Sequence, residues 1–104
     1  NEIYKTWFGM TAKEYKQFKG LRKENLRDNM DNIELILTDL SEEATKQIAL
    51  KQKPQGLQEN IKVAKRGGCI AKQARDNLEK ELGESVVTKN NKLNYEYVKE
   101  IDVQ

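Results

Sequence analysis

The sequence of 104 residues contains no histidine, so the commonest general base and the commonest metal ligand are both missing. Walker A, dinucleotide-binding and nucleophile-elbow motifs are missing as well. These absences favour a protein that is not an enzyme and that needs no metal or other cofactor.

Cysteine and long apolar segments are also scarce. The single cysteine, Cys69, cannot form an internal disulfide, which fits a reducing compartment. No apolar run approaches the roughly 20 residues that a transmembrane helix needs, and no signal-peptide pattern opens the chain. We therefore expect a cytoplasmic protein that does not associate with a membrane.

Proline occurs once, at Pro54, whereas Glu, Lys, Gln, Leu and Ala recur throughout the chain. These residues lose little side-chain freedom in a helix. Because 37% of the residues are hydrophobic and 35% are charged, the core must be a narrow seam between helices with wide polar faces. The composition thus predicts one all-α domain.

Two long segments have the apolar period of a helix and predict helices over residues 32–52 and 58–82. Asp31 and Glu34 form a capping-box pattern before the first, a break near Ser41 is left open, and Gly83 suits the end of the second. The turn at residues 54–56 should make them a long antiparallel αα-hairpin. The apolar stripes are Ile33, Ile36, Leu37, Leu40, Ala44 and Ile48 on the first helix, and Ile61, Ala64, Gly68, Ala71, Ala74, Leu78 and Leu82 on the second.

Two short helices are expected ahead of the hairpin, at about residues 12–19 and 22–29, and should pack on it. Thr11 and Glu14 form the capping box of the first, and Leu26 and Met30 should turn inward from the second. Residues 85–88 have the composition of a strand but are too short to form a sheet alone. We expect a helical domain over residues 1–93 and an extended tail over residues 94–104.

The net charge of +2 conceals an alternation along the chain. Residues 1–30 carry seven basic and four acidic side chains, residues 31–59 three and six, and residues 60–80 six and two. The two basic blocks either converge on a surface that binds phosphate groups or are solvated helix faces that pair with the acidic segment. The candidate binding residues are Lys13, Lys16, Lys19 and Arg22 in the first block, and Lys62, Lys65, Arg66, Lys72 and Arg75 in the second.

Five of the seven aromatic residues lie between residues 4 and 18, and Trp7 is the largest of them. They form either a contact surface for bases or a protein partner, or a cover of bulky side chains over the end of the hairpin. A domain with so few apolar residues favours the second interpretation. Trp7 is the aromatic residue most suited to both roles and is therefore a further candidate for contact with the partner.

Three residues of the second long helix need a steric or electrostatic explanation. Gly67 and Gly68 would each cost a helix about 1 kcal/mol relative to alanine, which predicts close helix packing or a kink. Arg75 lies beside the apolar stripe, where a lone cation is costly. We expect it to meet a carboxylate across the helix seam or to reach a ligand.

Two stretches of the sequence resemble the carboxy-terminal region of the DNA-damage-inducible protein D family, over about residues 3–88. The order and spacing agree, although the family pattern needs a small gap at residues 65–71. The matching positions are Ile3, Tyr4, Trp7, Gly9, Thr11, Glu14, Lys19, Gly20, Leu21, Leu26, Asp28, Met30 and residues 31–44 in the first stretch, and Gly56, Asn60, Val63, Ala64, Gly67, Arg75, Leu78, Glu79, Leu82, Gly83 and the Val-Val-Thr segment in the second.

The resemblance implies a bacterial protein of the SOS response to DNA damage, with an amino-terminal domain similar to phage proteins ahead of this region. It also implies a non-catalytic helical interaction module that modulates the strand-exchange recombinase on single-stranded DNA. The family offers no catalytic residues. The partners are then the recombinase filament or single-stranded DNA, and the missing amino-terminal domain, and the sequence leaves a homo-oligomer open.

The alternative function is that of a DNA-binding domain in a phage-type regulator. Residues 12–30 could then imitate a helix-turn-helix, with the two short helices joined at Gly20. Glu24 and Asp28 in the second helix would repel phosphate, which weakens this alternative.

Overall fold

A computed structural model describes residues 2–91, with backbone alone for residues 2–4. The predicted tail over residues 94–104 lies outside the described residues. The described chain contains the helices α1 (Glu2–Phe8), α2 (Ala12–Phe18), α3 (Asn32–Gln52) and α4 (Gly56–Leu82), and a short 3₁₀ turn, η1 (Arg27–Asn29). It contains no strand, so the all-α prediction is confirmed for this part of the chain.

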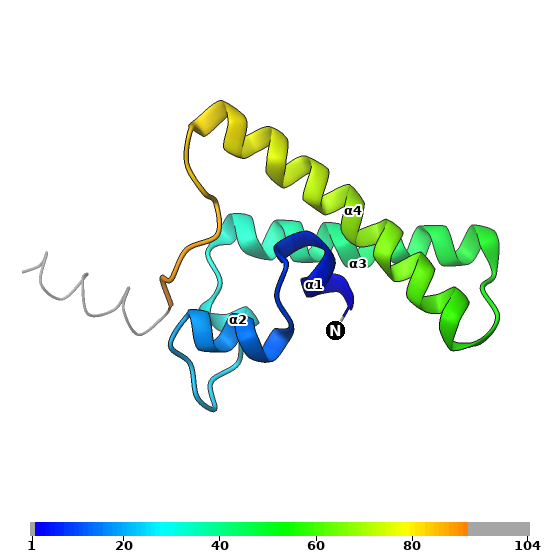
Figure 1. Cartoon of the computed structure of the whole chain (residues 1–104), viewed down its shortest axis with the longest axis horizontal. Helices are drawn as coiled ribbons and strands as arrows, with labels where there is room; N and C mark the ends of the chain where they lie inside the picture. The colour runs from blue at the N-terminus through cyan, green and yellow to red at the C-terminus, as the bar shows by residue number, and fades with distance from the viewer. Residues whose placement is uncertain (1, 92–104) are drawn as a thin grey trace, which may run out of the picture.

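The helices α3 and α4 form the predicted long antiparallel hairpin (Figure 1). The bounds of α3 are those predicted, and α4 begins two residues earlier than predicted, at Gly56. The helix α3 runs unbroken through Ser41, whose hydroxyl donates to the Leu37 carbonyl oxygen at 3.1 Å. Its end is set by Lys53, which adopts a left-handed conformation with φ 51°. None of the described helices combines the length and the apolar character needed to cross a bilayer.

The glycine pair in α4 marks the place where three helices meet. A Cβ on Gly67 would lie 2.8 Å from the Ser41 carbonyl oxygen of α3. A Cβ on Gly68 would lie 2.6 Å from the Thr6 Cβ of α1, a helix that the sequence analysis did not predict. Close packing is therefore confirmed as the reason for both glycines. Gly67 allows the close approach of α3, and Gly68 allows that of α1.

The hydrophobic core lies at the end of the hairpin that is remote from its turn. Its buried members come from all four α-helices and from the loops: Trp7, Tyr15, Leu21, Leu26, Met30, Leu37, Ala71, Val86 and Val87. Two predicted core positions are wrong, because Ile36 and Leu82 are 52% and 54% exposed. The core thus gathers loop residues that carry no helical period, which a search for apolar stripes does not detect.

The predicted helix over residues 22–29 is also wrong, although Leu26 and Met30 are buried as expected. Only η1 is helical there. The Glu24 carboxylate accepts the Arg22 N–H at 2.7 Å, and the Asn25 side-chain oxygen accepts the Asp28 N–H at 3.1 Å. These two side chains accept hydrogen bonds from backbone N–H groups that would be unpaired in the first turn of a helix. They therefore favour a turn over a helix in this segment.

Candidate nucleic-acid interface

The outer side of α4 carries exposed basic side chains. Lys62, Lys65, Arg66 and Lys72 are all exposed, while Val63, Gly67 and Ala71 of the same helix are buried. Lys72 pairs with Asp76 at 2.8 Å. Among the described residues, no carboxylate lies within ion-pair distance of Lys62 or Lys65. This side of the helix is therefore available to an anionic partner.

The antiparallel hairpin brings three further lysines, from the last turns of α3 and the residue after it, to the same end of the molecule: Lys46, Lys51 and Lys53, all exposed. Together with Lys62, Lys65 and Arg66 they form what we call the hairpin-end cluster. Residues 46–66 contain these six basic residues and one acidic residue, Glu59. With six basic side chains and one acidic side chain, this part of the hairpin has a net charge of +5.

The sequence analysis missed Lys46, Lys51 and Lys53 because residues 31–59 as a block are acidic. The acidic side chains of that block lie mostly between residues 31 and 43, at the other end of α3. Pro54 and Gly56 could have led to this cluster from the sequence, because they predict a turn. An antiparallel hairpin with that turn places residues 46–53 beside residues 60–66.

A hollow opens on the hairpin end beside the turn, lined by residues of both arms: Gln52, Pro54, Glu59, Lys62, Val63 and Arg66. Arg66 Nη1 donates to Gln52 Oε1 at 2.8 Å and so ties α4 to α3 across the hollow. Glu59 Oε1 accepts the Gln55 N–H at 3.2 Å at the start of α4. The Glu59 carboxylate is therefore engaged with the backbone at the start of α4, and the basic residues Lys62 and Arg66 also line the hollow.

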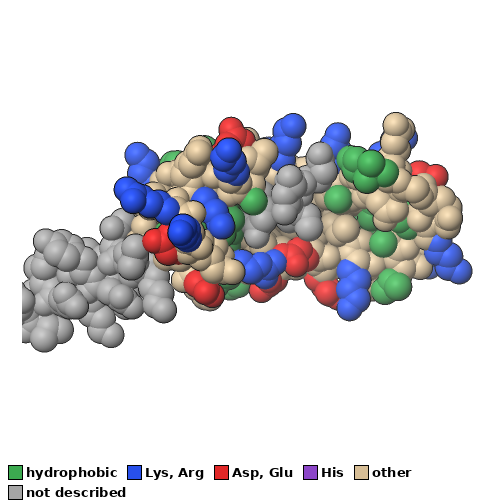
Figure 2. All heavy atoms as spheres, turned by 90° about the horizontal axis from the view of Figure 1, so that it is seen from below, with side chains coloured by type: hydrophobic (Ala, Val, Ile, Leu, Met, Phe, Trp, Pro, Cys, Tyr) green, Lys and Arg blue, Asp and Glu red, His purple; other side chains and the backbone are tan. Residues whose placement is uncertain are grey.

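Two leucines project from the same end of the hairpin. Leu50 of α3 is 63% exposed and Leu57 of α4 is 75% exposed. Figure 2, which looks from the side of α2, shows hydrophobic and basic side chains intermingled at the end that holds the hairpin turn. The hairpin end therefore combines positive charge with apolar surface.

The basic residues near α2 lie elsewhere. Lys13 and Arg22 are exposed and Lys16 is half-buried. Figure 1 shows α2 beside the first part of α3, whereas the hairpin-end cluster lies at the opposite end of α3. The helix α4 packs mainly on α3 and α1. The structure therefore keeps Lys62, Lys65 and Arg66 of the second predicted group apart from the basic residues of α2.

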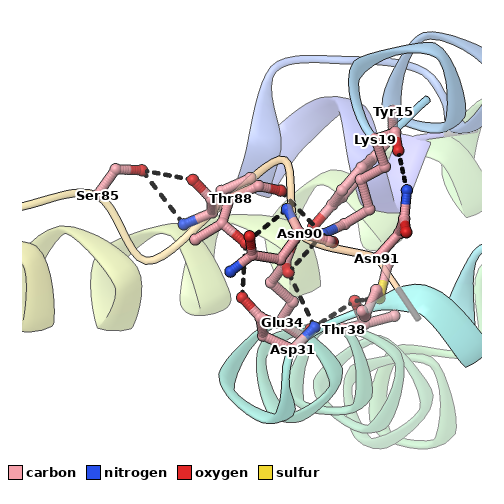
Figure 3. Close-up of polar contacts among 11 residues, drawn as sticks. Tyr15, Lys19, Asp31, Glu34, Thr38, Ser85, Thr88, Asn90 and Asn91 are labelled. Carbon is pink, nitrogen blue, oxygen red and sulfur yellow. Dashed lines mark hydrogen bonds and ion pairs between the residues drawn. The ribbon is translucent and has the colours of Figure 1, made fainter. Parts of the chain in front are cut away.

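Lys19 is buried, so its prediction as a contact for an external partner is wrong for this conformation. Its side chain is fully buried against Glu34, with Nζ 2.7 Å from Glu34 Oε1 (Figure 3). The ammonium also donates to the carbonyl oxygens of Thr88 at 2.9 Å and Asn90 at 2.7 Å. All three donors of Lys19 are thus used inside the fold.

The carboxylate of Glu34 is satisfied as completely as the ammonium that it faces. It accepts the Tyr15 hydroxyl at Oε2 and the Asp31 N–H at Oε1, the latter at 3.0 Å. The Thr88 hydroxyl donates to Asp31 Oδ2 at 2.6 Å. This buried network fastens residues 88–91 to α2 and α3, and its role is structural.

Arg75 meets a carboxylate, but on its own helix rather than across the seam. Its Nε lies 3.0 Å from Glu79 Oε2, and Nη1 donates to the Trp7 carbonyl oxygen at 3.3 Å. The guanidinium carbon lies 5.4 Å from the centre of the Phe8 ring, in cation–π geometry. Arg75 therefore fastens α1 to α4 and is engaged within the fold.

Glu79 links this contact to the segment after α4, because its Oε2 also accepts the Val86 N–H at 3.0 Å. Burial acts to raise the pKa of Glu79, but the Val86 N–H and Arg75 outweigh it and hold the pKa below its ordinary value of 4.5. A carboxyl with a lowered pKa in the folded state stabilises the fold above its unfolded pKa, and this stabilisation is lost as pH falls through the folded pKa.

We accordingly expect Glu79→Gln to be less stable than the natural chain at neutral pH, and the difference to shrink as pH falls below about 4.5. Urea denaturation of both chains between pH 7 and pH 3 measures the difference. Glu81→Gln, an exposed change on the same helix, is the control. A difference that stays constant over this pH range would contradict the role given to the ionised carboxylate.

Trp7 is also buried, with 1% of its surface exposed, so the prediction of a direct partner contact is wrong for this residue. Its ring centre lies 5.7 Å from that of Phe8 and 6.1 Å from that of Tyr15. Phe8 in turn lies 4.0 Å from Tyr15 and 5.7 Å from Phe18. These aromatic side chains are part of the core and its cover, as the low apolar content of the domain predicted.

Comparisons of the chain with protein-family models, with curated proteins and with solved structures found no match.

Proposed function

We propose that the chain is a non-catalytic helical interaction module that acts on single-stranded DNA or on the strand-exchange recombinase filament formed on it, in the bacterial cytoplasm during the response to DNA damage. The observation that carries the proposal is the exposed group Lys62, Lys65 and Arg66 on α4, in which neither lysine has a carboxylate partner among the described residues. The resemblance described above supports the choice of partner.

The energetic argument rests on the release of counterions. Each basic side chain that neutralises a phosphate frees a condensed cation, so affinity falls as salt concentration rises. Lys62, Lys65 and Arg66 lie within about one turn of α4 and can contact neighbouring phosphates without any change in the core. Single-stranded DNA coated with the recombinase presents the same phosphates wherever the strand remains accessible.

We expect the double charge reversal Lys65→Glu, Arg66→Glu to change the free energy of unfolding by no more than about 0.5 kcal/mol, because both side chains are exposed. The same change should weaken binding to bare or recombinase-coated single-stranded DNA and should flatten the salt dependence by about two phosphate contacts. A pull-down on both forms of DNA at several salt concentrations measures the effect.

The matched control is Lys5→Glu, Lys80→Glu, which makes the same change in net charge at exposed residues of α1 and α4 outside the hairpin end. Equal losses for the two double variants would assign the effect to net charge alone. Unchanged binding after the Lys65 and Arg66 reversal would refute the proposal that this side of α4 meets the partner.

The alternative of a phage-type regulator with a helix-turn-helix receives less support. Its second helix would have covered residues 22–29, where η1 is the only helical turn. A recognition helix needs enough length to lie in the major groove with several side chains on base edges. We therefore retain the interaction module as the proposed function.

A further inference from the structure

The hairpin end carries an inference that rests on the proposed function and specifies its ligand. We infer that the hairpin-end cluster is a binding site for single-stranded nucleic acid, in which lysines of both α3 and α4 hold the phosphates and Leu50 and Leu57 contact unstacked bases. The duplex and the anionic membrane are the competing ligands, and each is tested below.

The charge of the hairpin end fits a polyanion that spans both arms. Lys46 and Lys51 lie on α3, Lys62 and Lys65 on α4, and Lys53 in the turn between them, and all are exposed. Arg66 is held in place by its bond to Gln52, and a guanidinium has five N–H donors, so others remain for a phosphate. A ligand that touches both arms must carry several charges in a row.

The two exposed leucines favour a single strand over a duplex. A leucine gains free energy only when it finds another apolar surface to cover. In a duplex the flat faces of the bases are stacked and hidden, whereas a single strand can turn them outward. Leu50 and Leu57 are 63% and 75% exposed among the lysines. In a nucleic acid, only unstacked bases offer them such an apolar surface.

The polar side chains between the lysines favour nucleic acid over a lipid surface. The hairpin end exposes five amide side chains: Gln47, Gln52, Gln55, Gln58 and Asn60. Insertion of the leucines into a bilayer would carry several of these amides away from water, at a cost that lipid tails cannot repay with hydrogen bonds. Bases offer donors and acceptors at their edges, so the same amides remain satisfied against a strand.

Fluorescence anisotropy measures the binding of the full chain to a labelled oligothymidine and to the corresponding duplex. Sedimentation with phosphatidylglycerol vesicles measures its binding to an anionic membrane. The variant Lys46→Gln, Lys51→Gln removes two cations of α3 that the proposed function does not invoke. At about 0.1 M salt each lost contact to a single strand lowers affinity about 5-fold, so we expect roughly 25-fold for the pair. The control Lys5→Gln, Lys80→Gln should have little effect.

The leucines are tested by Leu50→Gln, Leu57→Gln, with Leu82→Gln at the other end of α4 as the control for loss of an exposed leucine. We expect the double variant to lose about 10-fold in affinity for the single strand, which corresponds to roughly 55 Å² of apolar contact at about 25 cal/mol per Å². Its affinity for the duplex should not change, so that the preference for the single strand disappears.

The outcomes separate this inference from the proposed function. Loss of binding on reversal of Lys65 and Arg66, with none on removal of Lys46 and Lys51, overturns the inference and leaves the proposed function standing. No effect of either change overturns both. Equal affinity for duplex and single strand, or vesicle binding that depends on the two leucines, overturns the assignment of a single strand.

Discussion

Replacement of Lys19 by methionine is expected to lower the free energy of unfolding by about 3–5 kcal/mol, the largest effect of any single change proposed for this chain. The variant leaves the fully buried carboxylate of Glu34 without its counter-charge. It also removes the donors to the Thr88 and Asn90 carbonyl oxygens, which are part-buried. Urea denaturation at pH 7 followed by circular dichroism measures the loss.

The second replacement Glu34→Gln, added to Lys19→Met, distinguishes the buried charge from lost packing. The double variant should be more stable than the sum of the two single losses predicts, because it leaves no unpaired ion. Lys16→Met, a half-buried change on α2, is the control and should have a small effect. A loss below about 1 kcal/mol for Lys19→Met would contradict the structural role given to the pair.

We expect Gly67→Ala to destabilise the fold by about 1–3 kcal/mol, even though alanine favours a helix by about 1 kcal/mol over glycine. The new Cβ would overlap the Thr45 hydroxyl and would lie 2.8 Å from both the Ser41 carbonyl oxygen and the Thr45 nitrogen. The backbone atoms can yield only if α3 and α4 separate. Thermal denaturation measures the effect.

Two further variants isolate the backbone contact. Thr45→Ala combined with Gly67→Ala removes the overlap with the hydroxyl but leaves both backbone contacts, so we expect only part of the stability to return. Cys69→Ala, two residues further along α4 and exposed, should be neutral. A Gly67→Ala chain as stable as the natural one would mean that the helices are not in close contact at this position.

The sequence also shows how far a local pattern can locate a binding surface. Lys62, Lys65 and Arg66 were found by their density along α4, and the structure leaves them exposed. Lys19 has the same chemistry and similar neighbours in the sequence, yet it is buried against Glu34, 15 positions away. Whether a lysine lies on the surface or in the core depends on the residues that face it in space, and its neighbours in the sequence do not show which residues those are.

The long hairpin follows from the sequence, because helical period, capping residues and turn formers act over a few neighbouring positions. Such patterns predicted the capping boxes at Thr11 and Asp31, the end of α4 at Gly83 and the close contacts at Gly67 and Gly68.

Tertiary structure decided what depends on residues far apart in the chain. It placed α1 against Gly68, fastened the segment of Val86 and Val87 to the core, and joined the lysines of α3 to those of α4. These arrangements depend on which surfaces meet when the helices pack, because burial, ion pairing and summed charge are properties of space rather than of sequence order.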